Sequence, residues 1–376
     1  MTNAPQRLSE LPDSLWAAVT PPLTGLSHLE GMFKTDVLVI GAGFTGLSAA
    51  LHLRRLGAEV MVVDAVEPGY GASGRNNGQV IPTLSRADPD MIAARHGEAG
   101  ERFVGLLRDS ADGLFKLAAE ERIEAEAEQT GWVQPVHSPG RMKIAERRVR
   151  EWAKHGAPVE LIDRAAMAKK LGSEAWHGGW WNRTGGHVNP LALSRGLARA
   201  VIARGGQIFS DSPVVALNRA APVWVATLPY ARVTARAVIV ATNAYTDAFA
   251  HLLTPEVARE VIPVLSWQMA TKPVAEDARQ HVIPGRNAVS DTHGELYFMR
   301  YDARHRLVTG GALVNPRNGA ERLRSYIGAR LERLFPKLGR VSFDYVWNGY
   351  IGMTTDFMPR FHALGPDGYA WGGCNG

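Results

Sequence analysis

The chain has 376 residues, of which 45% are hydrophobic and 21% are charged, and its 42 Lys and Arg against 37 Asp and Glu give a formal net charge of +5. These values are those of an ordinary folded protein of about two domains, and they exclude a disordered, collagen-like or disulfide-stapled protein. The single cysteine permits no intrachain disulfide, no apolar run approaches the roughly 20 residues of a membrane span, and the basic residues are too scattered for a nucleic-acid-binding face.

The beginning of the chain has the clearest pattern of secondary structure. Residues 1–34 form a proline-containing leader, which we expect to be an arm anchored by Trp16. Residues 36–40 are an apolar run of strand length, and the apolar residues within 47–53 then recur at near-helical spacing. Residues 59–64 have the pattern of a second buried strand. This succession predicts a βαβ unit.

The remaining chain alternates between helical and strand patterns after an irregular, Gly-rich stretch at residues 65–85. We expect helices at residues 88–128, 146–171, 194–204 and 320–334, a short buried strand at 237–242, and antiparallel strands within 261–315. The predicted fold class is therefore α/β with an α+β insertion: a Rossmann-like domain and a discontinuous second domain built on an antiparallel or mixed sheet.

A glycine fingerprint lies between the first predicted strand and the helix. Gly41, Gly43 and Gly46 satisfy G-x-G-x-x-G, and Asp64 ends the next strand. In this motif the first glycine allows a tight turn, the second lets backbone approach a pyrophosphate, and the third lets helix and strand pack closely. The helix N-terminus offers N–H groups to phosphates, and Asp64 is placed to bind a ribose diol. The motif predicts dinucleotide binding without separating FAD from NAD.

The Gly-rich stretch at residues 71–79, Gly-Ala-Ser-Gly-Arg-Asn-Asn-Gly-Gln, resembles the flavin-binding loop of FAD-dependent amine oxidases. These enzymes belong to the D-amino-acid-oxidase-like superfamily, and the closest branch is the gamma-glutamylputrescine oxidase family. Agreement with the same family continues, in the same order, at residues 16–18, 41–53, 185–190, 240–245, 347–349, 354–359 and 372–376. The resemblance thus spans nearly the whole chain.

The resemblance implies a two-domain flavoenzyme with non-covalently bound FAD. Its segments would be an N-terminal arm at 1–34, an FAD-binding domain at 35–110, 185–260 and 340–376, and a substrate domain at 111–184 and 261–339. Relatives continue past the turn at 372–376 with another glycine and a helix whose N-terminus faces the flavin. We therefore expect a truncated third FAD-binding segment, and with it weak FAD binding and poor turnover.

The resemblance also implies which residues contact FAD. Besides the three fingerprint glycines and Asp64, these are Phe44, Thr45, Ala72, Ser73, Arg75, Asn76, Asn77, Gly78, Gln79, Val214, Ala241, Thr242, Asn243, Gly349, Thr354, Gly373 and Asn375. Val214, expected on a strand, would hold the adenine side through its backbone. Residues 349–352 lack the cysteine that attaches flavin in sarcosine-oxidase relatives, so we expect no covalent attachment. Residues 307–310 lack the lysine that these relatives carry near the flavin, so how oxygen is activated stays open.

The region that covers the flavin in relatives supplies three pocket candidates, Trp267, Tyr297 and Arg300. Strand alternation puts Tyr297 with Met299 on one side and Phe298 with Arg300 on the other, and either pair can line the pocket. No catalytic base is evident from the sequence.

His187 is a fourth pocket candidate, and its two interpretations are a side chain that ties a turn and a contact to flavin or substrate. Asp291, His293 and Glu295 could resemble three metal ligands, but Gly294 between them favours a turn, so we expect no metal.

The expected function is that of a cytoplasmic FAD-dependent oxidoreductase in polyamine or amino-acid breakdown. It would oxidise a C–N bond of an amine or amino acid, such as gamma-glutamylputrescine, to an imine that hydrolyses to an aldehyde, with oxygen reduced to hydrogen peroxide. Three alternatives stay open: a dehydrogenase of the same fold that passes electrons to a quinone or carrier, an NAD-dependent enzyme, and a non-catalytic nucleotide-binding fragment.

Overall fold

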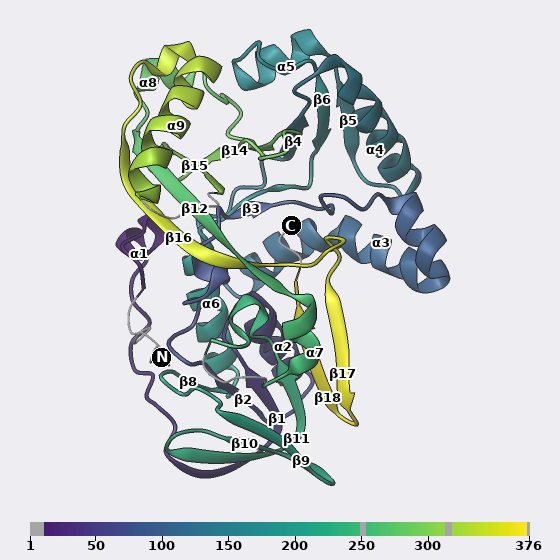
Figure 1. Cartoon of the computed structure of the whole chain (residues 1–376), viewed down its shortest axis with the longest axis vertical. Coiled ribbons are helices and arrows are strands. Elements are labelled where there is room, and N and C mark those ends of the chain that lie inside the picture. Colours follow the sequence, from purple (N-terminus) through teal and green to yellow (C-terminus); the bar gives the residue numbers. More distant parts are fainter. Residues whose placement is uncertain (1–10, 249–252, 313–317, 374–376) are drawn as a thin grey trace. The chain divides into compact units, whose positions relative to one another are not determined.

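The computed structural model describes residues 11–248, 253–312 and 318–373, and the chain divides into two compact units (Figure 1). Of the described residues, unit 1 comprises 11–76, 190–248, 253–265 and 349–373, and unit 2 comprises 77–189, 266–312 and 318–348. These boundaries differ from the sequence-based ones at residues 110, 184, 260 and 339. Two of the observed boundaries, at 265/266 and 348/349, fall inside long strands, where the composition of the sequence does not change.

Unit 1 contains an eight-stranded sheet in the order β17-β18-β11-β1-β2-β8. In addition, β10 pairs with β11, and β9 pairs with β10. Its strands are β1 (Gly31–Ile40), β2 (Val60–Val63), β8 (Gln207–Phe209), β9 (Ala216–Ala220), β10 (Val223–Thr227), β11 (Ala231–Val240), β17 (Arg360–Gly365) and β18 (Gly368–Gly372). The path from β18 to β8 is parallel, and β17 pairs antiparallel at one edge. The end of β1, residues 37–40, is buried throughout, as a strand covered on both faces must be.

The helices of unit 1 include the one that connects β1 with β2. They are α1 (Leu15–Val19), α2 (Phe44–Arg55), α6 (Pro190–Ala203), α7 (Pro255–Glu260) and the short 3₁₀ turns η1 (Ala72–Gly74) and η3 (Asn243–Tyr245). The predicted βαβ unit is thereby confirmed as β1-α2-β2. Helix α6 begins at Pro190 and not at Ser194 as expected, because proline is favourable in the first helical turn.

The leader is held to unit 1 by Trp16, as the sequence predicted. Trp16 is fully buried, and its indole Nε1 donates a hydrogen bond to the carbonyl oxygen of Asn76 at 2.9 Å. Ser14 caps the one-turn helix α1 by accepting a hydrogen bond from the Ala17 N–H at 3.1 Å. The arm is shorter than residues 1–34, since β1 already begins at Gly31.

Unit 2 is built on a second eight-stranded sheet, in the order β16-β12-β15-β14-β13-β4-β6-β5. Its strands are β4 (Trp132–Pro135), β5 (Val159–Ile162), β6 (Gly179–Asn182), β12 (Ile262–Pro273), β13 (Ala288–Ser290), β14 (Phe298–Tyr301), β15 (Arg306–Ala312) and β16 (Phe343–Met353), and a separate pair is formed by β3 (Gln79–Val80) and β7 (Gly186–His187). The β13–β4 pair is parallel and its neighbours are antiparallel, so the sheet is mixed.

The helices of unit 2 correct two expectations. They are α3 (Pro89–Glu120), α4 (Met142–Lys154), α5 (Arg164–Leu171), α8 (Glu276–Arg279), α9 (Gly319–Leu334), η2 (Pro139–Arg141) and η4 (Pro336–Leu338). The helix expected at 146–171 is two helices, because residues 159–162 pair with β6 as a strand. The helix expected at 88–128 ends at Glu120 and is kinked at Gly97, whose φ is +56°. No helix in the described ranges has the length and apolarity needed to cross a bilayer.

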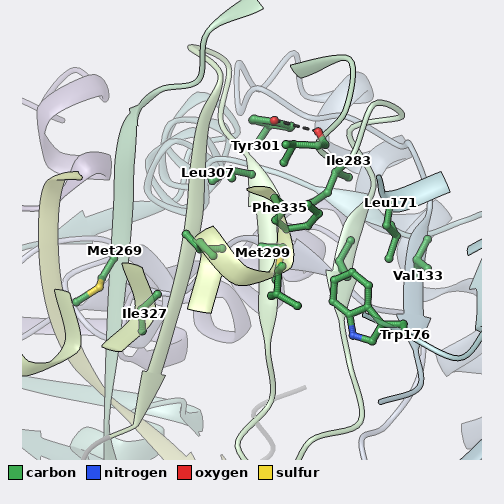
Figure 2. Close-up of a cluster of buried hydrophobic side chains, with 14 of the residues drawn as sticks. Val133, Leu171, Trp176, Met269, Ile283, Met299, Tyr301, Leu307, Ile327 and Phe335 are labelled. Carbon is green, nitrogen blue, oxygen red and sulfur yellow. Dashed lines mark hydrogen bonds between the residues drawn. The ribbon is translucent and has the colours of Figure 1, made fainter. Parts of the chain in front are cut away.

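The hydrophobic core of unit 2 lies against one face of its sheet (Figure 2). Met299 and Tyr301 of β14 and Leu307 of β15 point into it and meet Ile327 of α9 and Phe335. The Tyr301 hydroxyl donates a hydrogen bond to a backbone carbonyl at 3.0 Å, which satisfies its buried polar atom. Because side chains alternate along a strand, the residues between these, such as Arg300, point to the opposite face.

Candidate functional site

The predicted cofactor residues of unit 1 lie along one edge of its parallel sheet. The fingerprint loop 41–46 follows β1, Asp64 follows β2, residues 241–243 follow β11 and Gly373 follows β18. The Asn243 side chain joins two of these loops by accepting a hydrogen bond from the Gly373 N–H at 2.9 Å. In open α/β sheets, ligands bind beyond the carboxyl ends of the parallel strands, which is where this edge lies.

Two of the fingerprint glycines are required by backbone geometry. Gly41 has a φ of +104°, and a Cβ placed on it would lie 2.7 Å from the carbonyl oxygen of Ala241. A Cβ on Gly46 would collide with the carbonyl oxygen of Gly41. Gly43 differs, because the atoms near its missing Cβ belong to the Ser73 side chain, with Oγ at 2.9 Å. Gly43 therefore leaves the first turn of α2 accessible.

The N-terminus of α2 presents hydrogen-bond donors next to Gly43. The Phe44 N–H donates to Ser73 Oγ at 3.0 Å, and the first bond within the helix runs from the Leu47 N–H to the Gly43 carbonyl at 3.0 Å. Helix geometry gives the N–H groups of Thr45 and Gly46 no partner inside the helix. Together with the positive end of the helix dipole, these groups make an anion site that fits a pyrophosphate.

Asp64 closes the other side of the fingerprint loop. Its Oδ2 accepts a hydrogen bond from the Ala42 N–H at 2.7 Å, and its Oδ1 accepts one from the Val66 N–H at 2.9 Å. Burial raises the pKa of the Asp64 carboxyl above its ordinary 3.8, although both backbone hydrogen bonds lower it. Each carboxylate oxygen can accept more than one hydrogen bond, so Asp64 can still accept hydroxyl groups of a ribose.

The Gly-rich loop before residue 77 is held in shape by its own side chains. Arg75 donates from Nε to the Tyr70 carbonyl at 2.6 Å, and its guanidinium carbon lies 4.4 Å from the centre of the Tyr70 ring. Asn76 donates from Nδ2 to the carbonyls of Ala72 and Ser73, both at 3.0 Å. These contacts fix Ala72, Ser73, Arg75 and Asn76 relative to one another.

Gly349 and Tyr245 lie around this arginine. A Cβ on Gly349 would be 2.8 Å from Arg75 Cδ, so the glycine makes room for the side chain. The Tyr245 hydroxyl accepts a hydrogen bond from the Tyr350 N–H at 3.3 Å, and its ring lies 6.5 Å from that of Tyr70 in an edge-to-face arrangement. Sequence reasoning assigned no role to Tyr245 or Tyr70. Tyr245 stands in the resembling stretch 240–245, which could have identified it.

The remaining predicted residues of unit 1 are placed as follows. Val214 is buried, but it lies in the loop between β8 and β9 and not on a strand as expected, because pairing with β10 begins only at Ala216. The Thr354 hydroxyl donates to the Met358 carbonyl at 2.7 Å, and its methyl group occupies the space beside Gly373, where a Cβ would collide. Asn375 lies outside the described residues.

The last three residues of the predicted flavin loop belong to unit 2. Gln79 donates from Nε2 to the carbonyls of Val289 at 2.9 Å and Met299 at 3.2 Å, and its Oε1 accepts from Ser290 Oγ at 2.6 Å. The Gly78 carbonyl accepts a hydrogen bond from the Val188 N–H at 2.8 Å. Asn77 donates from Nδ2 to Gln268 Oε1 at 3.4 Å. The segment is thus fastened to the face of the sheet opposite the core.

The structure separates the four pocket candidates. Arg300 shares the face of Gln79, and it donates from Nε to the Asn77 carbonyl at 2.9 Å. Trp267 and Tyr297 instead pack against the hydrophobic core on the other face. Tyr297 is stacked on the His293 ring at 4.0 Å, with the Arg330 guanidinium 4.2 Å from its ring centre. Of the two alternating pairs, Phe298 and Arg300 are the pair on the Gln79 face.

His187 is buried and ties one part of unit 2 to another. Its Nε2 lies 3.0 Å from the Arg286 carbonyl, and its strand β7 pairs with β3 opposite Gln79. Burial, with the positive charge of Arg300, lowers the pKa of the His187 imidazole from 6.5 to about 3. A neutral ring that donates to a carbonyl matches the turn-tying interpretation.

This pKa predicts a pH-dependent stability. Between about pH 6.5 and pH 3, His187 is protonated in the unfolded state but stays neutral in the folded state. The free energy of unfolding therefore falls as the pH is lowered through this range, by up to about 1.4 kcal/mol per pH unit. His187→Gln keeps a donor for the Arg286 carbonyl, so we expect a shallower slope in urea unfolding between pH 7 and pH 5. His52→Gln, at an exposed position of α2, is the control. Parallel slopes for His187→Gln and the parent would contradict the assignment.

No group of three His, Cys, Asp or Glu side chains in the described part of the chain is arranged to hold a metal ion. Of the three residues that could resemble metal ligands, Asp291 and His293 pair with each other, with His293 Nδ1 2.5 Å from Asp291 Oδ2. The fully buried Asp291 also accepts the Tyr297 N–H at 2.9 Å. The carboxylate oxygens of Asp291 are therefore used in local hydrogen bonds.

Comparison with known proteins places this arrangement in a family. Residues 36–376 match the family described as FAD dependent oxidoreductase. The gamma-glutamylputrescine oxidoreductase of Escherichia coli (strain K12) is 30% identical over 371 residues, which cover 98% of this chain and 86% of that protein. Two solved structures, each 18% identical, share the fold: glycine oxidase from Geobacillus kaustophilus, with a TM-score of 0.74 over 91% of this chain and 89% of that one, and L-proline dehydrogenase from P.horikoshii, with a TM-score of 0.76 over 91% and 88%.

Proposed function

The chain belongs to the FAD dependent oxidoreductase family, and from that premise we propose that it oxidises a C–N bond of an amine of the gamma-glutamylputrescine type, with oxygen as the electron acceptor. The observation that carries the proposal is the edge of the unit 1 sheet, where Asp64, the start of α2 and residues 241–243 converge beyond parallel strands. The 30% identity with a gamma-glutamylputrescine oxidoreductase over 98% of the chain supports the substrate class.

The residues of unit 1 fit FAD at its nucleotide end. Asp64 would accept the ribose hydroxyls, the N–H groups at the start of α2 would bind the pyrophosphate, and the backbone of Val214 would hold the adenine side. Arg75 and the loop that ends at Gln79 would surround the flavin end, held without a covalent bond. FAD supplies the two-electron acceptor, and the protein supplies orientation, electrostatics and exclusion of water.

The substrate must reach the site as a neutral amine, because a hydride leaves poorly from a carbon next to an ammonium group. Loss of the hydride and one proton gives an imine, which water hydrolyses to an aldehyde and ammonia or a smaller amine. With oxygen the balance is amine, water and O₂ on one side, and aldehyde, ammonia and H₂O₂ on the other. His187 does not serve as the base in this proposal, since burial lowers the pKa of its imidazole to about 3 and makes it a weak base at neutral pH.

The test is anaerobic mixing of the FAD-loaded protein with a panel of amines, followed by absorbance near 450 nm, the band of oxidised flavin. We expect bleaching by a mono-acylated diamine, recovery of the band on admitting oxygen, and one peroxide per turnover. The bleaching rate should rise with pH as the amine loses its proton. Bleaching without peroxide would mean that a carrier, and not oxygen, accepts the electrons. A flavin that no amine or amino acid bleaches would contradict the proposal.

A further inference from the structure

The sheet of unit 2 has a second face, which we call the Gln79 face and define by Gln268, Ser290, Phe298, Arg300, Val308 and Gly310. Register places these residues opposite one another: Gln268 pairs with Gly310, Arg300 with Val308, and Ser290 with Phe298. Their neighbours along each strand, such as Met269 and Met299, point into the core. The predicted flavin-loop segment 77–79 is hydrogen-bonded to this face through Gln268, Ser290 and Arg300.

Arg300 is a positively charged side chain on this face, and it is surrounded by backbone carbonyls. It is only 1% exposed. Its Nε donates to the Asn77 carbonyl at 2.9 Å, its Nη2 to the Val188 carbonyl at 2.7 Å, and its Nη1 to the Tyr301 carbonyl at 2.9 Å. All three guanidinium nitrogens are therefore engaged by the protein itself.

These bonds converge on one short piece of backbone. Arg300 binds the carbonyl of Asn77 directly, and it also binds Val188, whose N–H donates to the Gly78 carbonyl at 2.8 Å. The guanidinium thus joins the beginning of β3 to the end of β7 and sets the position of the Asn77–Gly78 peptide. Hydrogen bonds from a charged donor are about twice as strong as neutral ones, so this contact restrains the backbone firmly.

The charge of Arg300 persists in spite of its burial. Burial lowers the pKa of the guanidinium to about 10, while Asp302, Glu126 and Glu128 oppose the shift through their negative charge. The side chain is therefore still cationic at neutral pH, but its donors are directed at carbonyl oxygens within the protein. A substrate carboxylate would have to displace one of these bonds to reach it.

We propose that Arg300 is a positioning residue that fixes the Asn77–Gly78 backbone for the flavin. The inference requires FAD binding but no particular amine, so it can fail while the proposed oxidation of C–N bonds stands.

The test compares Arg300→Met and Arg300→Lys with the parent protein. We expect Arg300→Met to weaken FAD binding about tenfold or more and to change the shape of the bound flavin spectrum, with partial rescue in Arg300→Lys, because one or two charged hydrogen bonds are worth at least that factor. FAD affinity is measured by quenching of flavin fluorescence, and thermal unfolding is followed in parallel. Equal FAD affinity and spectra in all three proteins would overturn the positioning role.

A matched control is Arg148→Met, which removes another buried arginine of unit 2. Arg148 binds Asp88, Gln134 and the Ser85 carbonyl, and its hydrogen bonds do not involve the loop at residues 77–79. We expect this variant to lower the unfolding temperature without changing the flavin spectrum. A spectral change of the same size in Arg148→Met would show that general destabilisation explains the Arg300 result, and would also overturn the positioning role.

Discussion

Replacing Gly41 by alanine is expected to weaken FAD binding by at least about 100-fold, which corresponds to about 2.7 kcal/mol. The residue has a φ of +104°, and the new Cβ would lie 2.7 Å from the Ala241 carbonyl oxygen. The oxygen belongs to the backbone, and the backbone also fixes the position of the Cβ, so no rotamer change can relieve the contact. The end of β1 and the loop after β11 would have to separate, and both are part of the proposed cofactor site. Titration calorimetry with FAD measures the effect.

Gly57→Ala is the matched control for this variant. Gly57 also has a positive φ, +89°, but nothing lies within 4 Å of its missing Cβ. Both substitutions therefore strain the backbone, by roughly 1 kcal/mol, and only Gly41→Ala adds the collision. We expect Gly57→Ala to lower the unfolding temperature slightly and to bind FAD like the parent. Similar FAD affinities for the two variants would show that the collision at Gly41 does not matter for the site.

Asp64→Asn is expected to weaken FAD binding by roughly 10- to 100-fold, as expected for loss of a charged hydrogen-bond acceptor. In the parent, one carboxylate oxygen accepts the Ala42 N–H and the other accepts the Val66 N–H. An amide has a single acceptor oxygen, so one of these N–H groups would face an NH₂ group, and the ribose hydroxyls would lose the negative charge.

The same carboxylate predicts how FAD affinity depends on pH. Burial raises the pKa of Asp64 above 3.8, and only the ionised form accepts hydroxyl groups with all its lone pairs. FAD affinity should therefore fall as the pH is lowered through this raised pKa, and the fall should be absent in Asp64→Asn. A parent and variant with the same pH profile would contradict the assignment of the ribose to Asp64.

Asp36→Asn provides the control for this pair of experiments. Asp36 also accepts a backbone N–H, that of Glu59 just before β2, at 3.0 Å, and it forms an exposed ion pair with Arg236 at 3.3 Å. It lies in β1 ahead of the carboxyl end where the cofactor residues converge. We expect its replacement to leave FAD affinity and the pH profile unchanged.

Around the candidate cofactor site, the secondary structure that the sequence predicted correctly is the part with short-range constraints. The apolar run of β1, the glycines and the acid at the end of β2 lie within one βαβ unit, where spacing along the chain determines spacing in the fold. Glycine is also required for local reasons at positions 41 and 46, where a Cβ would meet backbone atoms. A pattern that lies in one unit of this kind can be recognised without knowing what packs against it.

The domain boundaries illustrate the opposite case. Those at 265/266 and 348/349 fall inside β12 and β16, so the chain passes from one unit to the other without a linker or a change of composition. The boundary at 76/77 divides the Gly-rich loop that the sequence presented as one motif. Which unit a residue joins depends on contacts with segments far along the chain, and those contacts leave no local pattern.

The sequence by itself thus determined the βαβ unit that carries Asp64, and with it the prediction of dinucleotide binding, because both depend on residue types at fixed local spacing. The family and FAD followed from the resemblance at residues 71–79 and the other matching stretches. Only the tertiary structure decided that Phe298 and Arg300 share the Gln79 face while Tyr297 and Trp267 pack against the core. Alternation along β14 left both assignments equal, and the choice follows from which face buries more apolar area under α9. Away from that core, burial also keeps His187 neutral, with its ring held by the Arg286 carbonyl, and the nitrogens of Arg300 donate to backbone carbonyls.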